Sequence, residues 1–449
     1  MTFSASSSFA PKSAGDSKWL ASIEWLLIVA TAAYHCCIGP HEIWGDGAVR
    51  YDTLVKLIDH GEVTASLYSI MHSFLAAPLY LLGKPWDRAQ QFASYFNVVL
   101  FYLALILFYG LLRRQWPSAL LRRTILIVVA ASMFGNNIQN FYGEVLTACT
   151  AMLAFAALST NRPILSGIAM CISVVNTPAA ALGLVLCNGW WGWRTRRWFH
   201  AVWPVCLSAT LIVLEFWWRR GSPIQSGYEG KSGIPTFMPY SGLPGFSYPI
   251  LLGLLSLLFS FGRGILIYAP GLLLHHVPTR SKKNPAVSMF AELSMAFFWG
   301  MVLAYSAWWC WYGAWCWGPR FLLVACVPAS FALARHITDA ERKHLAVTAL
   351  VVVSIVWSAW VGINGTVIRE VETEPCMSNN FNLEAICFYI PEFSPLIHPL
   401  IKPKALMPWD RVEVLLGSGV AVVLLLPFLW IRARDFSIRT LSRASQGKS

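Results

Sequence analysis

Charged residues are scarce in this chain. Asp, Glu, Lys and Arg make up 12% of its 449 residues, whereas soluble proteins average about 25%. Hydrophobic residues reach 56%, and several runs approach the roughly twenty apolar residues that a helix needs to cross a bilayer. The shortage of charge excludes an ordinary soluble protein and predicts an all-α polytopic membrane protein.

Acidic residues are the scarcer charged class, because 22 Asp and Glu face 34 Lys and Arg, a net charge of +12. An excess of this size can indicate nucleic-acid binding. Here most basic residues fall on the side of the apolar runs that we assign to the cytoplasm, as in Arg113-Arg114 and the tail 432–449. This distribution follows the positive-inside rule, so no nucleic-acid partner is expected.

Metal-ligand spacing is missing from the 11 cysteines. Most of them lie within apolar runs and are expected to be small core residues. Cys376 and Cys387 share one polar loop, so they either form a disulfide, if that side of the membrane is oxidising, or stay reduced. No cofactor is expected, and a divalent metal such as Mg²⁺ or Mn²⁺ has no support from ligand spacing.

The apolar runs divide the chain into a membrane domain with two short flanks. The expected parts are a cytoplasmic segment 1–18, a transmembrane domain 19–431 and a basic cytoplasmic tail 432–449. The positions of the runs predict about 12 transmembrane helices.

Two long outer loops are expected, at 39–91 and 364–411. Within the first, the amphipathic segment Ala48–His60 and the apolar segment Ser66–Gly83 predict interfacial helices. The conspicuous polar and aromatic segments of the chain fall on this same side.

Asp46 follows the first apolar run and stands between Gly45 and Gly47. Glycines let the backbone turn tightly there and leave the carboxylate unshielded. A carboxylate held beside a membrane is a candidate general base. The alternative is a solvated loop acid that pairs with Arg50, four residues further along a helix.

Three further charged residues lie near the mouths of apolar runs. Glu144 begins one run and is either a helix-end charge or a catalytic group. Arg263, between two glycines inside an apolar run, needs an anionic partner there, either another acid or a phosphate. Arg320 begins another run and follows the aromatic turn 308–317 after Gly318-Pro319.

These residue types suggest a phosphate-bearing lipid substrate. Arginine makes charge-assisted, bidentate hydrogen bonds to phosphate. Aromatic side chains can stack on sugar rings, although most of the 22 Trp fit an interfacial belt. Because an outer compartment has no ready supply of nucleotide sugars, a sugar donor on that side is expected to be linked to a lipid.

Five short motifs occur in order along the chain: Gly45-Asp46-Gly47 with Arg50-Tyr51, Tyr68-Ser69 with residues 77–83, residues 261–264 with Tyr268-Ala269-Pro270, residues 315–321, and Ser394-Pro395-Leu396 with His398. From about residue 20 to residue 411 the chain resembles the GT-C integral-membrane glycosyltransferases. These include the protein O-mannosyltransferases and the aminoarabinose transferase of lipid A.

The resemblance implies an inverting transfer from a polyprenyl-phosphate sugar to a hydroxyl of a glycan, lipid or protein acceptor. Asp46 matches the catalytic aspartate that takes the hydroxyl proton, and Glu144 is the second candidate catalytic residue. The leaving phosphate would be neutralised by Arg263 and Arg320. The expected substrate-binding residues are Arg50, Tyr51, His72, Arg263, Tyr268, Trp315, Arg320 and His398.

Two departures leave the acceptor type and metal dependence open. Gly47 stands where many relatives carry a second acid, and Ala76-Ala77-Pro78 replaces a common double proline. A transporter or lipid flippase is the alternative outside this enzyme class, and it would need charged groups at mid-membrane and repeat symmetry. An O-antigen ligase or polymerase would share the membrane geometry. The expected location is the inner (plasma) membrane, with the site facing the periplasm or exterior.

Overall fold

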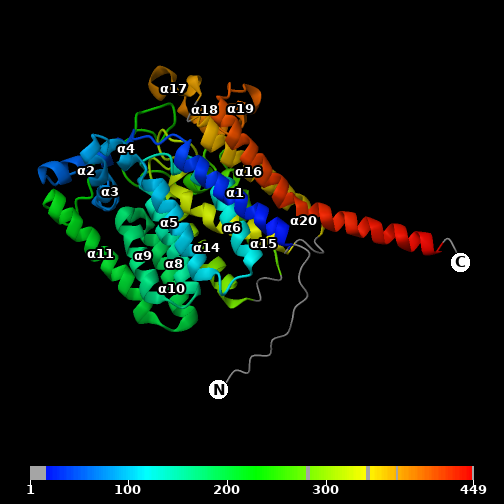
Figure 1. Cartoon of the computed structure of the whole chain (residues 1–449). Helices are drawn as coiled ribbons and strands as arrows, with labels where there is room; N and C mark the ends of the chain where they lie inside the picture. The colour runs from blue at the N-terminus through cyan, green and yellow to red at the C-terminus, as the bar shows by residue number, and fades with distance from the viewer. Residues whose placement is uncertain (1–16, 280–283, 340–343, 371–372, 447–449) are drawn as a thin grey trace.

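The structure is a computed structural model that describes residues 17–279, 284–339, 344–370 and 373–446. Over these residues the chain folds into helices, and no β-strand occurs among them. The predicted all-α class is therefore confirmed. Figure 1 shows a bundle of helices from which the end of α20 projects.

Seven helical stretches within the described ranges are long and apolar enough to cross a membrane. They are α1 (Lys18–Cys37), α4 (Ala89–Ser94) with α5 (Phe96–Leu112), α11 (Trp198–Arg220), α14 (Pro285–Ser306), the 3₁₀ segment Arg320–Ala325 with α15 (Cys326–Thr338), α16 (Leu345–Ile363) with its π-helical end Asn364–Ile368, and the first part of α20 (Pro408–Gln446). Shorter apolar helices are α8 (Glu144–Ser159), α9 (Pro163–Asn176) and α12 (Ile250–Phe259). The chain is therefore a multi-pass membrane protein.

The other α-helices are shorter or more polar. They are α2 (Asp46–Val55), α3 (Ile70–Gly83), α6 (Ser118–Ala130), α7 (Phe134–Asn137), α10 (Ala181–Thr195), α13 (Ile265–Tyr268), α17 (Glu374–Phe381), α18 (Glu384–Tyr389) and α19 (His398–Ile401). The expected interfacial segments are thus helical: α2 runs into the π-helical turn Lys56–His60, and α3 covers most of Ser66–Gly83.

The two long segments that were expected to be outer loops, 39–91 and 364–411, meet at one end of the bundle. Figure 1 places α2, α3 and α4 toward the same end as α17, α18 and α19. An ion pair joins the loops, with 3.2 Å between Arg369 Nη1 and Glu42 Oε1. The first loop is also fixed to the α7–α8 connection, because the Trp44 Nε1 donates to Asn140 Oδ1 at 2.7 Å. Segments far apart in the sequence are thereby gathered around one region.

A buried network docks α11 against the start of α3. Glu215 of α11 accepts hydrogen bonds from Ser69 Oγ at 2.8 Å and from the Ile70 backbone N–H at 2.9 Å. Arg219 pairs with Glu215 at 2.7 Å and donates to the carbonyl of Tyr68 at 2.6 Å. The segment that carries Tyr68 is therefore held on both sides by charge-assisted hydrogen bonds, which are stronger than neutral ones.

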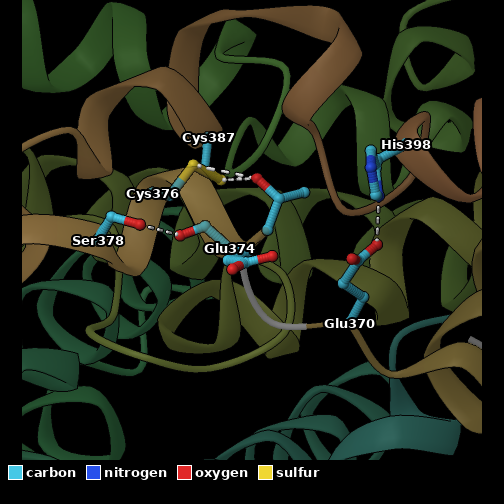
Figure 2. Close-up of a disulfide and its surroundings, with 7 residues drawn as sticks. Glu370, Glu374, Cys376, Ser378, Cys387 and His398 are labelled. Carbon is cyan, nitrogen blue, oxygen red and sulfur yellow. Dashed lines mark hydrogen bonds and ion pairs between the residues drawn. A yellow bond between two sulfur atoms is a disulfide. The ribbon is translucent and has the colours of Figure 1, made fainter.

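A disulfide joins Cys376 of α17 to Cys387 of α18, with an S–S distance of 2.01 Å (Figure 2). The next residue, Phe388, accepts a hydrogen bond from the Gly262 N–H at 3.0 Å. Helices α17 and α18 are therefore anchored on the segment that contains Arg263.

Glu24 is a carboxylate inside the bundle. It lies in α1 with 0% of its surface exposed and pairs with Arg122 and Arg123 of α6. The Arg123 Nε lies 2.8 Å from Glu24 Oε1. A buried charge is tolerated only when it is paired, so this network fixes α1 on α6.

Replacing Glu24 by Gln should destabilise the protein by roughly 3–5 kcal/mol, because two buried arginines would each lose their ion pair with Glu24. The measurement is the thermal unfolding midpoint of the purified protein in detergent. Glu62→Gln, at an exposed position, is the matched control. Equal midpoints for the two variants would contradict the role of Glu24.

Candidate active site

Asp46 lies at the start of α2 and faces a cation from a distant part of the chain. Its Oδ2 pairs with Nη2 of Arg320, 274 residues away. The Tyr68 hydroxyl donates a second hydrogen bond to the carboxylate. The Asp46 side chain is 29% exposed, whereas that of Arg320 is 4% exposed. The acid therefore stands at the rim of a buried charged cluster.

Local backbone geometry explains both glycines that flank Asp46. Gly45 has φ 54°, a left-handed conformation that glycine adopts without strain. A Cβ at Gly47 would lie 3.1 Å from the Phe141 carbonyl oxygen. Position 47 is thus packed closely against the α7–α8 connection.

Arg320 binds more than one acceptor. Its Nε lies 3.6 Å from Glu144 Oε1 and donates to the Gly313 carbonyl at 2.9 Å. Its guanidinium also stands 4.8 Å from the centre of the Tyr142 ring. A buried guanidinium is stable in such surroundings because two carboxylates and a ring face compensate its charge.

Arg50 is the second cation beside Asp46. It is 6% exposed, and its guanidinium lies 4.6 Å from the centre of the Tyr68 ring. Its Nε and Nη1 are buried without a hydrogen-bond acceptor in the part of the chain that the structure describes. Gly143 makes room for it, since a Cβ there would come within 2.6 Å of Arg50 Nη2.

The surrounding charges determine the ionisation of Asp46. Burial by itself would raise the pKa of this carboxyl group. The opposing effects of the Arg320 charge, the Tyr68 hydrogen bond and the Arg50 charge are larger together, and they hold the pKa of Asp46 below its ordinary value. Asp46 is therefore ionised at neutral pH.

Tyr228 extends the cluster from the loop 221–249. Burial raises the pKa of its hydroxyl to about 12, and the charges of Arg50, Asp46, Glu144 and Arg320 all act on it. The Tyr228 hydroxyl therefore lies within electrostatic range of both acids and both arginines. Its ring packs edge-on against Trp308 at 5.5 Å.

Of the residues predicted for the site, Glu144, Arg50 and Arg320 thus gather around Asp46. His72 lies behind them, buried in α3, and burial lowers the pKa of its imidazole to about 3. Its Nε2 is 3.1 Å from Asn97 Oδ1, and Asn97 in turn donates to the Tyr142 carbonyl at 2.8 Å. A neutral His72 therefore supports the backbone that carries Tyr142.

Arg263 and Tyr268 frame the aromatic turn. Arg263 is 1% exposed and donates to the carbonyls of Cys316 and Gly318. The Tyr268 hydroxyl donates to the Gly262 carbonyl at 3.0 Å, and its ring packs edge-on against Trp317 at 5.2 Å. These contacts orient the turn that leads into Arg320.

Three predicted residues contact other parts of the chain. Tyr51 packs against Tyr80, with 5.9 Å between ring centres. Trp315 is 47% exposed and stacks on Phe381 at 4.2 Å. His398 pairs with Glu370 at 2.9 Å, as Figure 2 shows. The structure does not bring these side chains into the described Asp46 cluster.

The tyrosines at positions 68, 142 and 228 were missing from the predicted site. Tyr68 belongs to one of the five motifs, and Tyr142 stands two residues before Glu144, which was the available signal. Within the described ranges, no group of three or more His, Cys, Asp and Glu residues is placed to hold a metal ion.

The fold has counterparts among solved structures. A crystal structure of ArnT from Cupriavidus metallidurans in the apo state gives a TM-score of 0.51 at 13% identity, covering 91% of this chain and 76% of that one. The chain shares the fold of ArnT. A crystal structure of ArnT bound to undecaprenyl phosphate gives a TM-score of 0.50, with the same identity and coverage. ArnT is the lipid A aminoarabinose transferase, so the predicted likeness in fold to that enzyme is confirmed.

The likeness to ArnT is one of fold alone at this identity. No family model matches the sequence. No curated protein matches it either. The chemistry must therefore be argued from the side chains of this chain.

Replacing Tyr68 by Phe should raise the pKa of Asp46, because the ionised carboxylate loses a hydrogen bond. The pKa can be followed by NMR of protein ¹³C-labelled at its aspartate carboxyl groups, with Asp46→Asn assigning the signal. Tyr51→Phe, at a tyrosine that packs on Tyr80, should leave the titration where it is. Identical titrations of Asp46 in the wild type and Tyr68→Phe would show that the hydroxyl does not act on the carboxylate.

Proposed function

We propose that this protein is a membrane glycosyltransferase that moves a sugar from a polyprenyl-phosphate-linked donor to an acceptor hydroxyl. The observation that carries the proposal is the cluster in which an ionised Asp46 faces buried Arg320 and Arg50. An acid beside two arginines can serve a reaction that takes a proton from a hydroxyl and releases a phosphate. The fold shared with ArnT, one structure of which holds undecaprenyl phosphate, supports the same donor class.

Arg50 and Arg320 are the proposed phosphate ligands. Arg50 has buried donors, Nε and Nη1, without an acceptor among the described residues. Phosphate oxygens would satisfy them with charge-assisted hydrogen bonds. Arg320 already holds Asp46 and Glu144, so a phosphate must compete with these carboxylates for its charge.

This competition bears on the strength of the base. A carboxylate whose pKa is lowered by ion pairing accepts protons poorly. When the donor phosphate takes part of the Arg320 charge, the pKa of Asp46 rises and the carboxylate becomes a better proton acceptor. Glu144 keeps its contact with Arg320 and holds the guanidinium in place. Donor binding therefore prepares the base.

The transfer itself is a single displacement at the anomeric carbon. The acceptor oxygen forms its bond to that carbon as the bond to the phosphate oxygen breaks on the opposite face. The hydroxyl proton passes to Asp46, and the bonding electron pair leaves with the polyprenyl phosphate. The arginines stabilise the charge of the leaving phosphate, and the anomeric configuration inverts.

The charged cluster is proposed to face the periplasm or exterior from the inner (plasma) membrane. The Cys376–Cys387 disulfide lies in the late outer loop, and disulfides persist in oxidising compartments. A lipid-linked donor suits that side because an outer compartment has no ready supply of nucleotide sugars.

Replacing Asp46 by Asn should lower sugar transfer by roughly 10²–10⁴-fold, which is the usual contribution of a positioned base. Transfer is measured in proteoliposomes with a set of radiolabelled polyprenyl-phosphate sugars and membrane extract as the source of acceptor. Binding of undecaprenyl phosphate should persist in this variant, because both arginines remain.

Asp52→Asn is the matched control, since Asp52 lies on the same helix and forms an exposed pair with Lys56 at 2.8 Å. It should transfer sugar as the wild type does. Equal transfer by both variants would remove Asp46 from the mechanism. Lipid movement across the bilayer without sugar transfer, unchanged in Asp46→Asn, would favour a flippase instead.

The pH dependence of the wild-type enzyme should reveal the competition for Arg320. Ionised Asp46 is the active form, so each rate profile falls as the pH drops through the pKa of Asp46. The profile of kcat/KM reports the enzyme without donor, and that of kcat reports the complex. The acidic limb of kcat should therefore lie at higher pH than that of kcat/KM, and coincident limbs would contradict the competition.

A further inference from the structure

Two adjacent arginines end helix α11 and bind the segment that precedes α3. Arg219 donates to the backbone carbonyls of Thr64 at 2.9 Å and Tyr68 at 2.6 Å. Arg220 donates to the carbonyl of Ser66. Each guanidinium lies within electrostatic range of the other. Two positive charges are therefore gathered on one short stretch of backbone.

The charge of this arginine pair is only partly compensated. Within the described ranges, Glu215 is the carboxylate that forms an ion pair with the arginines, and it binds Arg219 at 2.7 Å. Both Glu215 oxygens also accept hydrogen bonds at the start of α3. Glu229 lies within electrostatic range of Arg220, but its carboxylate accepts from two backbone N–H groups of its own turn at 2.7 and 2.8 Å. Arg220 thus has no ion-pair partner among the residues that the structure describes.

Three nitrogens of the pair are buried donors without an acceptor in the described part of the chain. They are Arg219 Nη2, Arg220 Nε and Arg220 Nη1. The Arg219 side chain is 0% exposed, whereas Arg220 is half-buried beneath the turn at Gly227, where an added Cβ would lie 2.8 Å from Arg220 Nε. Because unmatched buried donors of a charged group are unfavourable, the pair lacks an acceptor. A ligand would reach it from the side of this turn.

An oxyanion supplies what the pair lacks. Guanidinium groups bind phosphate and carboxylate oxygens with paired, charge-assisted hydrogen bonds. A neutral hydroxyl would accept a hydrogen bond but leave the charge of Arg220 uncompensated, and a hydrocarbon would supply neither acceptor nor charge. The chemistry of the pair thus selects a phosphate or carboxylate group.

Tyr68 connects the pair to the proposed reaction centre. Its backbone carbonyl binds Arg219, and its hydroxyl donates to Asp46. The pair and the proposed base therefore stand at opposite ends of one tyrosine residue. Arg50, a proposed ligand of the donor phosphate, lies 4.6 Å from the centre of the Tyr68 ring. An anion on the pair would thus be separate from the donor phosphate and still near the reacting hydroxyl.

The surroundings of the pair favour a substrate group over a phospholipid headgroup. Trp217 and Trp218, at the same end of α11, are 62% and 60% exposed, and tryptophans at the end of a span typically face the membrane interface. Arg219 and Arg220 instead bind the backbone of the segment before α3. This segment is the one that carries Tyr68 to Asp46.

We propose that Arg219 and Arg220 bind an acidic group of the acceptor, a phosphate or a carboxylate, and thereby hold one of its hydroxyls near Asp46. The acceptor role rests on the proposed function, whereas the binding of an oxyanion by the pair does not. The substrate class that follows is an acidic acceptor.

Binding is tested by isothermal titration calorimetry of the full-length protein in phosphatidylcholine nanodiscs. Undecaprenyl phosphate is added in excess, so that the donor-phosphate ligands are occupied. Glucose 6-phosphate and glucuronate are the acidic probes, and methyl glucoside is the neutral one. The wild type should bind at least one acidic probe more tightly than the neutral one. Arg220→Gln should weaken that binding about tenfold, because a charge-assisted contact is lost.

Lys231→Gln is the matched control, because it removes the same charge from an exposed position in the neighbouring loop. It should bind the acidic probe as the wild type does. Arg220→Lys should recover only part of the affinity, since lysine keeps the charge but not the paired donors. The thermal unfolding midpoint of each variant reports whether it is folded.

The acceptor role is tested by sugar transfer in proteoliposomes, with membrane extract divided by charge on an anion exchanger as the source of acceptor. The anionic fraction should accept the labelled sugar. Arg220→Gln should raise KM for this fraction about tenfold and leave KM for the donor unchanged.

Equal binding of the acidic and neutral probes, or equal binding by the wild type and Arg220→Gln, would overturn the inference. Retention of phosphatidylglycerol by the wild type but not by Arg220→Gln, measured by native mass spectrometry, would assign the pair to a lipid headgroup and overturn the acceptor role. Acidic-probe binding that depends on Arg220, in a protein that transfers nothing from polyprenyl-phosphate donors, would reject the proposed function and leave the oxyanion site in place.

Discussion

A buried guanidinium that must be compensated organises the polar end of this protein. Arg320 is 4% exposed, and the free-energy cost of removing its charge from water is large unless carboxylates surround it. Asp46 and Glu144 supply that compensation from the starts of α2 and α8. The interaction therefore requires that three segments, distant in sequence, reach one point. Much of the surrounding structure serves to deliver them there.

Supporting contacts hold two of the segments that surround the cluster. Glu215 and Arg219 bind the segment before α3, and this contact positions the Tyr68 hydroxyl beside Asp46. Arg263 holds the carbonyls of the aromatic turn, and so fixes the backbone that enters Arg320. Rigid supports of this kind keep reacting groups in position. Small displacements of such groups can lower the reaction rate strongly.

The electrostatic balance of the cluster is informative. Asp46 and Glu144 both pair with Arg320, whereas Arg50 has buried donors without an acceptor among the described residues. An anion that binds the arginines competes with the carboxylates, so one of the existing ion pairs must weaken when it binds. Asp46 is the member with the most exposed side chain, at 29% against 14% for Glu144, which makes it the group best able to change its partner.

The sequence predicted the class of fold because hydrophobic runs and their flanking charges are local features. It also indicated Asp46, Glu144, Arg50 and Arg320, since a charge at the mouth of an apolar run is visible without knowledge of packing. Tyr68 was missed because its contact with Asp46 depends on how α3 docks against α11. Trp315 and His398 were selected for their motifs, yet motif spacing does not say which way a side chain points. The partners of Glu24 were likewise hidden, because they lie in another helix.

The separation of 274 residues between Asp46 and Arg320 has a consequence for biosynthesis. The ribosome releases the chain from its N-terminus, so Asp46 enters the membrane long before its counter-charge exists. Until the turn that precedes α15 has been inserted, Asp46 can contact only residues that precede this turn in the sequence. The nascent protein therefore has no assembled reaction centre. The contact between Asp46 and Arg320 can form only after most of the polypeptide has been inserted into the membrane in the correct topology.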